Sequence, residues 1–442
     1  MGGDGGGGVE RAGGCRDRAD CSSGARSRAA RAKTHVDARR SSDTSYRQSL
    51  AARPGTGSSK LHDTDTDNLK EDLLAAVLAH HAWRQATNGS QIGWGVDPYV
   101  PQTPHHYPEA YALWGQGYVS LYELTDDPTF LRLAQDSAAW LMKNTSPRYS
   151  LPSWGLPWRW EAWQAPPDIS YVTTSVSAGQ LFLALYVVTK KAVYLDTGCK
   201  IARWMIYENG ADDTPSGLWL NYANFPPLKH PIFNATALGS GYFAQLYRLT
   251  NLENYKEWAL KTARFVLTHQ KPNGSWPYSV HVPTVDNVHT AYTLEGLWQA
   301  YSLLTAEQQE SLVRGARYYR ENLFATTGRA HQRTLFTLQE LGRIPLKRWF
   351  ADQLARLGLL PNRITEAPLG SYGAGLRFFA TASQIYPDFF PSAVQIFTYV
   401  NQRLRQSDGS YAYRSGETTP FIRHQAHWFA GMTKFAQHLQ SR

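Results

Sequence analysis

Several side chains in the segment 286–292 are suited to proton-transfer chemistry. Asp286 and Asn287 are residue types that begin helices, and His289 and Tyr292 follow in the first turns of the expected helix. Because residues three apart share a helical face, His289 and Tyr292 are expected to point in the same direction. An imidazole and a phenol placed in this way can act as a base and an acid. The structural alternatives are that Asp286 and Asn287 only cap the helix and that His289 packs in the core.

Aromatic residues precede this helix and recur in other loops. The chain contains 15 Trp and 25 Tyr residues, and the stretch 153–163 (SWGLPWRWEAW) contains four of the Trp residues. Aromatic rings stack on the apolar faces of sugars while polar groups hold the hydroxyls, so this composition predicts a carbohydrate-binding cleft. The residues predicted to contact the substrate are Trp154, Trp158, Arg159, Trp160, Glu161, Tyr107, Tyr171, Asn234, Trp276, Tyr278, Asn287, Tyr372, Arg423 and His427.

Two kinds of reaction on a sugar chain fit these residues. Hydrolysis of a glycosidic bond requires a carboxylic acid and a second carboxylate. The candidates for this pair are Glu109, Glu161, Asp168 and Asp286. Glu109 follows Pro108 in an expected first turn, where the helix dipole alone favours an acidic residue.

Elimination or C5 epimerisation of a uronic acid instead requires a base, an acid and a cation that neutralises the sugar carboxylate. His289 and Tyr292 would supply the base and the acid, and the cation would be Arg159 or Arg423. A non-catalytic protein, which binds glycans or acts as a scaffold in polysaccharide synthesis, is the third alternative. Across the two reactions, the predicted catalytic residues are His289, Tyr292, Glu109, Asp286 and Asp168.

Pairs of helices would position these residues. Apolar residues recur at helical spacing through most of the chain after residue 67, and the links inside each pair are short, which forces antiparallel neighbours. The expected pairs are 107–124 with 128–143, 171–188 with 192–208, 233–249 with 252–269, 287–304 with 306–322, a weaker pair within 331–357, and 372–386 with 391–404. The last helix, 424–439, is left to pack with the N-terminal helix that begins near Asn68.

The pairs are expected to close into a ring rather than to extend as an open solenoid. The first helix of each pair opens with small and hydroxylated residues, as in 233–241 (FNATALGSG), which allows the close approach that an inner ring needs. The loops between the pairs are long and uneven, which is typical of functional insertions. The sequence therefore predicts an all-α fold, an α/α toroid of six or seven helical hairpins over residues 63–442.

The first 62 residues form a separate basic tail. They contain 12 Lys and Arg against 6 Asp and Glu, a net charge of +6 out of +9 for the whole chain. The tail is rich in Gly, Ser and Arg and has almost no large apolar residues, so it is expected to be disordered. It lacks interleaved aromatic residues, and nucleic-acid binding is not expected.

No cofactor or metal is predicted. His424 and His427 lie three residues apart on one helical face, but no third ligand has recognisable spacing. Cys15 and Cys21 lie in the tail and Cys199 stands alone, so no disulfide framework is expected. The longest clear apolar run, 181–188, is shorter than a membrane span. No apolar signal segment is seen near the N-terminus, so a cytoplasmic location is expected.

Three motifs resemble a known group of proteins. The stretches 154–160 (WGLPWRW), 166–175 (PPDISYVTTS) and SWPY followed by 285–297 (VDNVHTAYTLEGL) resemble VpsJ-like six-hairpin toroid proteins of bacterial exopolysaccharide biosynthesis. That group is similar in architecture to six-hairpin glycosidases, polysaccharide lyases and glucuronyl C5-epimerases. The resemblance implies a polysaccharide or oligosaccharide partner. Arg159 and Ala291 depart from the group's motifs, which have an acidic residue and Gly there, so the role of that acid does not carry over.

A second resemblance is to the triterpene cyclases, which are also α/α toroids. The stretch 269–276 (HQKPNGSW) looks like their repeat of Gln, Gly and Trp. Those enzymes use an acidic aspartate motif, and its only approximation lies at 63–66 (DTDT), outside the expected cleft. The predicted cleft is also polar, which disfavours a hydrocarbon substrate.

Overall fold

The computed structural model describes residues 63–333 and 366–441. All of them belong to the second of two compact units, Pro54–Arg442. Most of the weaker helical pair predicted within 331–357, and the basic tail, lie outside the described residues.

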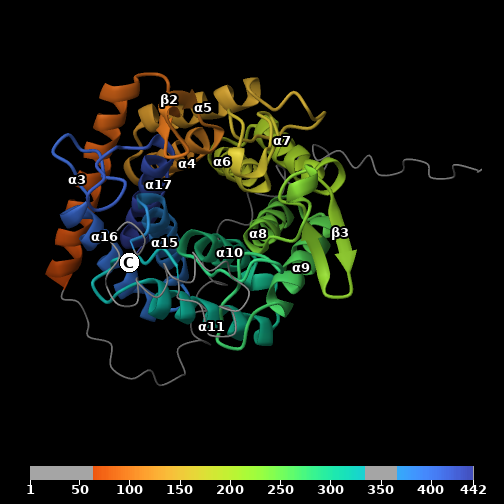
Figure 1. Cartoon of the computed structure of the whole chain (residues 1–442). Coiled ribbons are helices and arrows are strands. Elements are labelled where there is room, and N and C mark those ends of the chain that lie inside the picture. Colours follow the sequence, from red (N-terminus) through yellow and green to blue (C-terminus); the bar gives the residue numbers. More distant parts are fainter. Residues whose placement is uncertain (1–62, 334–365, 442) are drawn as a thin grey trace, which may run out of the picture. The chain divides into compact units, whose positions relative to one another are not determined.

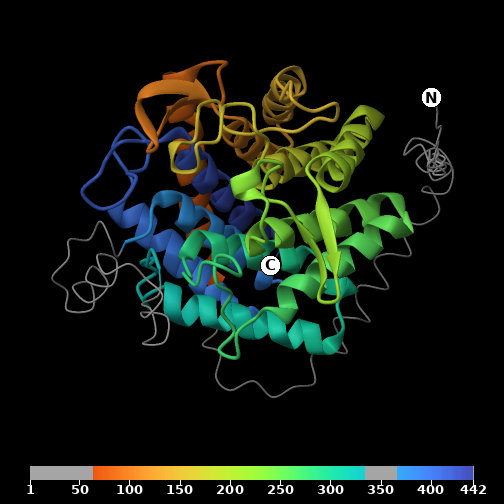
Figure 2. The same ribbon diagram turned by 45° about the vertical axis from the view of Figure 1, so that its right-hand side comes forward.

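Six described helices form a closed inner ring (Figures 1 and 2). Each inner helix contacts the next one along the chain, and the last contacts the first. In order they are α4 (Pro108–Thr125), α6 (Val172–Thr189), α8 (Phe233–Thr250), α10 (Asn287–Gln299), α15 (Leu369–Ala382) and α17 (Ile422–Gln440). This closure confirms the prediction of an α/α toroid rather than a solenoid.

An outer helix packs against each inner helix of the described ring. The outer helices are α3 (Asp63–Asn88), α5 (Pro128–Lys143), α7 (Ala192–Arg203), α9 (Glu253–Thr268), α11 (Ala306–Leu323) and α16 (Phe390–Arg403). The N-terminal helix α3 packs on the last helix, α17, as predicted. Links inside the pairs are short. Asp127, for example, caps α5 by accepting a hydrogen bond from the Thr129 amide at 2.8 Å.

Some helix ends differ from the predicted ones. The structure ends α10 at Gln299, not at Leu304, and a 3₁₀ turn at Tyr301–Leu303 follows it. The α15 helix begins at Leu369, directly after Pro368, three residues before its predicted start. The polypeptide after Arg203 continues as a π-helical turn, Trp204–Glu208.

The long loops also carry two short antiparallel hairpins that the sequence analysis did not predict. One pairs β1 (Trp94–Asp97) with β2 (Val100–His106), and the other pairs β3 (Ala211–Thr214) with β4 (Gly217–Leu220). Gly217 has a φ of +128°, which disfavours residues with a Cβ and marks the turn of the second hairpin. These loops join the end of an outer helix to the start of an inner one, so they gather over the N-terminal ends of the inner helices.

Small residues let the inner helices approach closely. A Cβ at Gly296 of α10 would overlap the carbonyl oxygen of Ala237 in α8, and a Cβ at Gly373 of α15 would overlap that of His427 in α17. These contacts agree with the expectation from the small residues in the inner helices. Among the described helices, α6 has the length and hydropathy of a membrane span, with 61% of it buried inside the ring.

His80 of α3 is a buried histidine in an aromatic environment. Its ring lies 5.1–6.0 Å from the rings of Trp83, Trp114, Tyr411 and Phe429. Neither ring nitrogen has a hydrogen-bond partner among the described residues. Burial, with smaller contributions from neighbouring charges, lowers the pKa of His80 to about 3.

This low pKa predicts that His80 makes the protein sensitive to acid. As the pH falls below 6.5, the unfolded chain binds a proton at this position before the folded chain does, so stability is lost between pH 6.5 and about 3. The loss amounts to roughly 1.4 kcal/mol per pH unit. We therefore expect the free energy of unfolding of His80→Phe to fall by about 2 kcal/mol less than that of the wild type between pH 7 and pH 5. Urea unfolding followed by circular dichroism measures this difference.

The matched control is His281→Gln, because His281 is exposed. It should show the pH dependence of the wild type. An equal loss of stability in His80→Phe and in the wild type would contradict the prediction.

Candidate active site

A group of aromatic side chains lies over the N-terminal ends of the inner helices. We call this group, made of Tyr99, Trp160, Tyr171 and Tyr222, the aromatic wall. Trp160 lies at its centre, with its ring 5.6 Å from that of Tyr171, 6.3 Å from that of Tyr222 and 6.4 Å from that of Tyr99. Tyr99 is 61% exposed, which is unusual for a large aromatic residue. Trp160 and Tyr222 are half-buried, whereas Tyr171 is buried beneath them. The exposed and half-buried rings provide flat surfaces on which a sugar can stack.

His289 and Asp286 form a hydrogen-bonded pair at the start of α10. The carboxylate of Asp286 accepts from the backbone amide of His289 at 3.0 Å and from its Nδ1–H at 2.7 and 2.8 Å. Asp286 therefore caps the helix and also fixes the orientation of the imidazole. With Nδ1–H engaged, the neutral ring presents the lone pair of Nε2 as a base.

The His289 side chain is 33% exposed and lines a small crevice. Tyr278 packs its ring at 4.6 Å and nearly perpendicular to that of His289. Asn234, at the start of α8, lies in the same crevice, and its buried amide oxygen and nitrogen have no partner among the described residues. Buried amide atoms normally find a partner, so Asn234 is available to hold a substrate hydroxyl.

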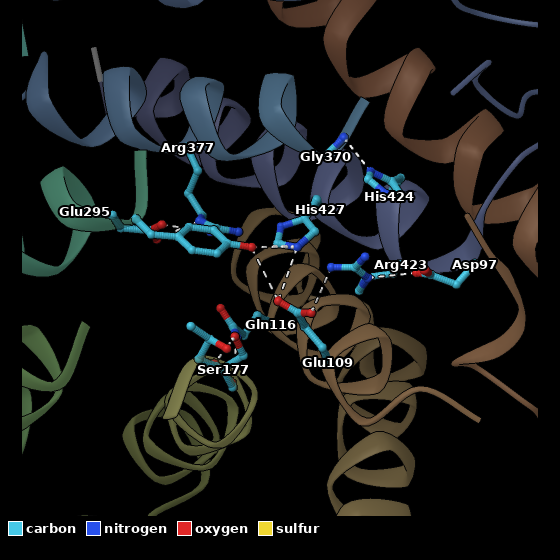
Figure 3. A network of polar contacts seen from close by, with 12 residues as sticks. Asp97, Glu109, Gln116, Ser177, Glu295, Gly370, Arg377, Arg423, His424 and His427 are labelled. Carbon is cyan, nitrogen blue, oxygen red and sulfur yellow. Dashed lines mark hydrogen bonds and ion pairs between the residues drawn. The ribbon is translucent and has the colours of Figure 1, made fainter. Parts of the chain in front are cut away.

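Glu109 of α4, Tyr292 of α10 and His427 of α17 form a second cluster. Figure 3 shows Glu109 and His427 within this network. The Tyr292 hydroxyl lies 2.9 Å from Nε2 of His427 and 3.4 Å from Oε1 of Glu109. Oε1 of Glu109 is also 3.4 Å from Nε2 of His427. All three residues are more than nine-tenths buried: Tyr292 is 9% exposed, His427 is 3% exposed and Glu109 is 8% exposed.

Arg423 extends this cluster to the β1 strand. Its Nε lies 2.9 Å from Oδ2 of Asp97, whose side chain is fully buried, and its Nη1 lies 3.7 Å from Oε2 of Glu109. Figure 3 shows this chain of contacts from Asp97 through Arg423 to Glu109. Two carboxylates thus share one guanidinium, so Arg423 is engaged by the protein itself.

The charges in this cluster determine the protonation of Glu109. Burial acts to raise its pKa, but the hydrogen bond and charge of His427, together with Arg423 and Tyr292, outweigh burial and lower the pKa to about 2. Burial lowers the pKa of His427, although Glu109 acts against this effect. Burial also raises the pKa of Tyr292 well above its usual value. At neutral pH the cluster therefore holds an ionised Glu109 and a protonated phenol.

Three predicted site residues occupy structural positions. The Trp154 and Trp276 side chains are buried, with their indole N–H groups donating to the carbonyls of Leu141 and Val266. Tyr372 is fully buried and donates to Glu366. Trp154 and Tyr372 are almost completely buried, whereas Trp276 is buried but still lines the crevice that contains His289. Burial argues against the predicted substrate contact of Trp154 and Tyr372, and the predicted contact of Trp276 stays a prediction.

Asn287 is structural as well. Its amide donates to the carbonyl of Leu323, and its oxygen accepts from the hydroxyl of Tyr319. The side chain is completely buried. It ties the start of α10 to α11, which holds His289 and Tyr292 in place.

The remaining predicted residues are either buried beside the aromatic wall or exposed on the loop between α5 and α6. Trp158 and Tyr107 are buried against each other, with their ring centroids 4.8 Å apart. Arg159 and Glu161 form an exposed ion pair at 3.4 Å. Asp168 is exposed at a left-handed position with a φ of +71°, and its carbonyl accepts from Ser146.

Sequence reasoning missed Asp97, Tyr99 and Tyr222. Asp97 is separated from its partner Arg423 by 326 residues, and nothing in the local sequence signals the pairing. Tyr222 ends an aromatic stretch, LWLNY, which did carry a signal. The described residues contain no group of three or more His, Cys, Asp or Glu side chains placed to hold a metal ion. The Nδ1 of His424 instead accepts from the amide of Gly370 at 3.1 Å.

Comparisons with known proteins identify the class of fold. No protein-family model and no curated protein matches this chain. Solved structures that are similar to it include a cellobiose 2-epimerase from Spirochaeta thermophila, with 11% identity and a TM-score of 0.60, over 86% of this chain and 98% of that one. The family 88 glycosyl hydrolase from Bacteroides vulgatus has 10% identity and a TM-score of 0.57, over 84% and 99%.

An α-1,6-mannanase of Salegentibacter sp., solved as an inactive variant with α-1,6-mannotetrose, is also similar. It has 11% identity and a TM-score of 0.61, over 83% of this chain and 99% of that one. At this level of identity, the likeness establishes the fold alone. The chain has the six-hairpin glycosidase fold. The neighbours named above share this fold and are carbohydrate-processing enzymes.

Proposed function

We propose that this protein is a carbohydrate-active enzyme that transfers protons at the carbon next to the carbonyl group of a sugar, as an epimerase or isomerase does. The observation that carries the proposal is the pair of His289 and Asp286, with Nδ1–H bound at 2.7 Å and the other ring nitrogen left as a base. His289 would remove the proton on C2 of the open-chain sugar. An enediolate would result, and its developing charge needs hydrogen-bond donors.

Tyr292 would supply the second proton-transfer group. Its hydroxyl lies 2.9 Å from His427 and stays protonated, because burial raises its pKa. It would return a proton to C2 on the face opposite to His289. The phenolate would then regain a proton from water, and the protonated His289 would release one to water, which restores the starting state of both groups. Inversion at C2 follows when the proton leaves by one face and arrives by the other.

The carboxylates of this site disfavour glycosidic hydrolysis. A hydrolase needs a protonated carboxylic acid at the leaving oxygen. Glu109 has a pKa of about 2 and is therefore ionised at neutral pH. Asp286 is bound to His289, and Glu161 and Asp168 are exposed on a loop.

The local charge also disfavours a uronic acid. Asp97, Glu109 and Asp286 carry three formal negative charges around the site, and Arg423 carries one positive charge, a sum of −2 with neutral histidines. Arg423 is already shared by two carboxylates, so it is not free to neutralise a substrate carboxylate. A neutral sugar fits this field better than an acidic one. The neighbours named as cellobiose 2-epimerases agree with this choice.

The resemblance to VpsJ-like proteins supports a proposal for the natural substrate. We propose that the natural substrate is an oligosaccharide of a bacterial exopolysaccharide, and that the protein acts in the cytoplasm. The aromatic wall around Trp160 would hold the sugar units that follow the reducing end.

The test is solvent exchange at C2. Incubation of the protein in D₂O with cellobiose, glucose or another neutral reducing sugar should place deuterium on C2, detected by mass spectrometry and by loss of the C2 proton signal. Epimer formation should accompany it. Release of new reducing ends, or an unsaturated product from a uronic acid polymer, would contradict the proposal. Glycan binding without deuterium exchange at C2 would favour the alternative that the chain is a non-catalytic glycan-binding protein.

A further inference from the structure

A second cavity, of about 430 Å³, lies away from the aromatic wall. It is bounded by the C-terminal halves of the inner helices, whereas the candidate active site uses their N-terminal ends. Its volume is in the range of about 300 to 1,000 Å³ that is usual for small-molecule sites. Its lining combines apolar side chains with many polar and charged ones, so apolar packing alone does not explain it.

Five glutamines line this cavity, one from each of five inner helices. Their side chains form a partly connected ring, in which Gln299 accepts from Gln180 at 3.3 Å and also from Gln245. The five are Gln116, Gln180, Gln245, Gln299 and Gln437. Each carboxamide has both donor and acceptor atoms, and such groups recognise the hydroxyls of a sugar.

Three cationic side chains, Arg248, Arg377 and Lys434, line the cavity together with the glutamine amides. Arg377 forms a bidentate ion pair with Glu295 at 2.6 and 2.7 Å, and Figure 3 shows this pair on the side of the network away from Asp97. Arg248 donates to the Gln299 carbonyl at 2.8 Å. Lys434 makes no hydrogen bond or ion pair with the described residues. With Glu123 and Glu295 as the acids, the lining has three positive and two negative formal charges, a net of +1.

Two donors in this lining are left without partners in the described part of the chain. They are Nη1 of Arg377 and Nε1 of Trp298, both buried. Buried donors normally have a hydrogen-bond partner, and an unsatisfied cationic donor is especially costly. A ligand oxygen in the cavity would satisfy them.

We propose that this cavity is a second ligand site, which binds a small sugar acid, that is, a polyhydroxylated monocarboxylate. The carboxylate would pair with Lys434 and Nη1 of Arg377 and balance the excess positive charge. The hydroxyls would bind the glutamine amides. The site is separate from the aromatic cleft, where the net charge has the opposite sign, and it does not depend on the epimerase proposal.

Calorimetric titration of the full-length protein with D-glucuronate, D-glucose and acetate tests this site. D-glucuronate should bind with a Kd below about 1 mM, and the other two at least tenfold more weakly. Lys434→Met should weaken D-glucuronate binding about tenfold. Ala184→Trp, which fills the cavity from α6, should abolish it. His289→Gln, in the candidate active site, and Lys143→Met, on the exposed end of α5, should bind like the wild type.

Hydrogen exchange on the wild-type protein gives a measurement that needs no variant. D-glucuronate should protect the segments 180–187 and 245–248 and leave 286–293 unchanged. Absence of binding would overturn the proposal, and equal binding of D-glucose would overturn the assignment to a sugar acid. Protection of 286–293 alone, or loss of binding only in His289→Gln, would move the ligand to the cleft and overturn the second site.

Discussion

Replacing His289 with glutamine is expected to lower the rate of deuterium exchange at C2 of a neutral reducing sugar by about 10²- to 10⁴-fold, the usual contribution of a general base. Glutamine keeps a side chain of similar reach and can still bond to Asp286, but it has no nitrogen lone pair with which to accept the proton. Both exchange into the starting sugar and formation of the epimer should fall together. Mass spectrometry of sugar recovered from D₂O measures the two rates in one sample.

Asp286→Asn separates the two roles of that residue. Asparagine is as good a helix cap as aspartate, so the melting temperature should stay close to that of the wild type. The amide can no longer hold the Nδ1–H of His289 with a negative charge, so exchange should slow and its pH profile should move. An unchanged melting temperature together with an unchanged exchange rate and pH profile would show that Asp286 is only a cap.

A histidine in the same segment supplies the control for His289. His281 is exposed and its imidazole is not paired with a carboxylate in the described structure. His281→Gln should keep the wild-type exchange rate. If His289→Gln also retained more than about one-tenth of that rate, general-base catalysis by His289 would be excluded, because such a small loss lies below the usual range.

The fold was predictable because its signals are local. Helical spacing, short links and small residues each act over a few positions, and together they indicate antiparallel helices that pack closely. The ring closure between α17 and α4 was inferred from loop heterogeneity, and the structure confirms it. The hairpins β1–β2 and β3–β4 were missed, because strands of four to seven residues in a loop carry little periodic signal.

The site was only partly predictable, for two physical reasons. The start of α10 was recognised because the cap and the imidazole lie within four residues of each other, and the structure shows that Asp286 caps the helix and also holds His289. Whether a tryptophan faces a cleft or the core, by contrast, depends on the partner surface. Trp154 and Trp276 donate to backbone carbonyls inside the protein, which their positions in aromatic loops did not indicate.

Long-range ion pairs set the charge of the site, and these had no sequence signal. Asp97 lies 326 residues before Arg423 in the chain, and Glu295 lies 82 residues before Arg377. Arg423 was predicted as a cation for the substrate. The structure shows that Asp97 and Glu109 both engage it, and this contact supports the proposal of a neutral rather than an acidic sugar.

Tyr292→Phe is expected to separate the two proton transfers. Without the hydroxyl, no group on the second face can return a proton to C2, so formation of the epimer should fall by about 10²-fold or more. His289 is untouched and can still remove and return a proton on its own face. Deuterium exchange into the starting sugar should therefore stay within about tenfold of the wild-type rate, and only inversion should be lost.

The result distinguishes proton delivery by Tyr292 from a purely structural role. Tyr247→Phe, which removes a hydroxyl that bonds to Glu253 on the outer side of the ring, controls for the loss of a hydrogen bond. A structural role for Tyr292 would reduce exchange and inversion by the same factor, because both need the same folded site. Equal loss of the two rates would assign proton return to another group, and His427, 2.9 Å behind the phenol, would then become the residue to replace.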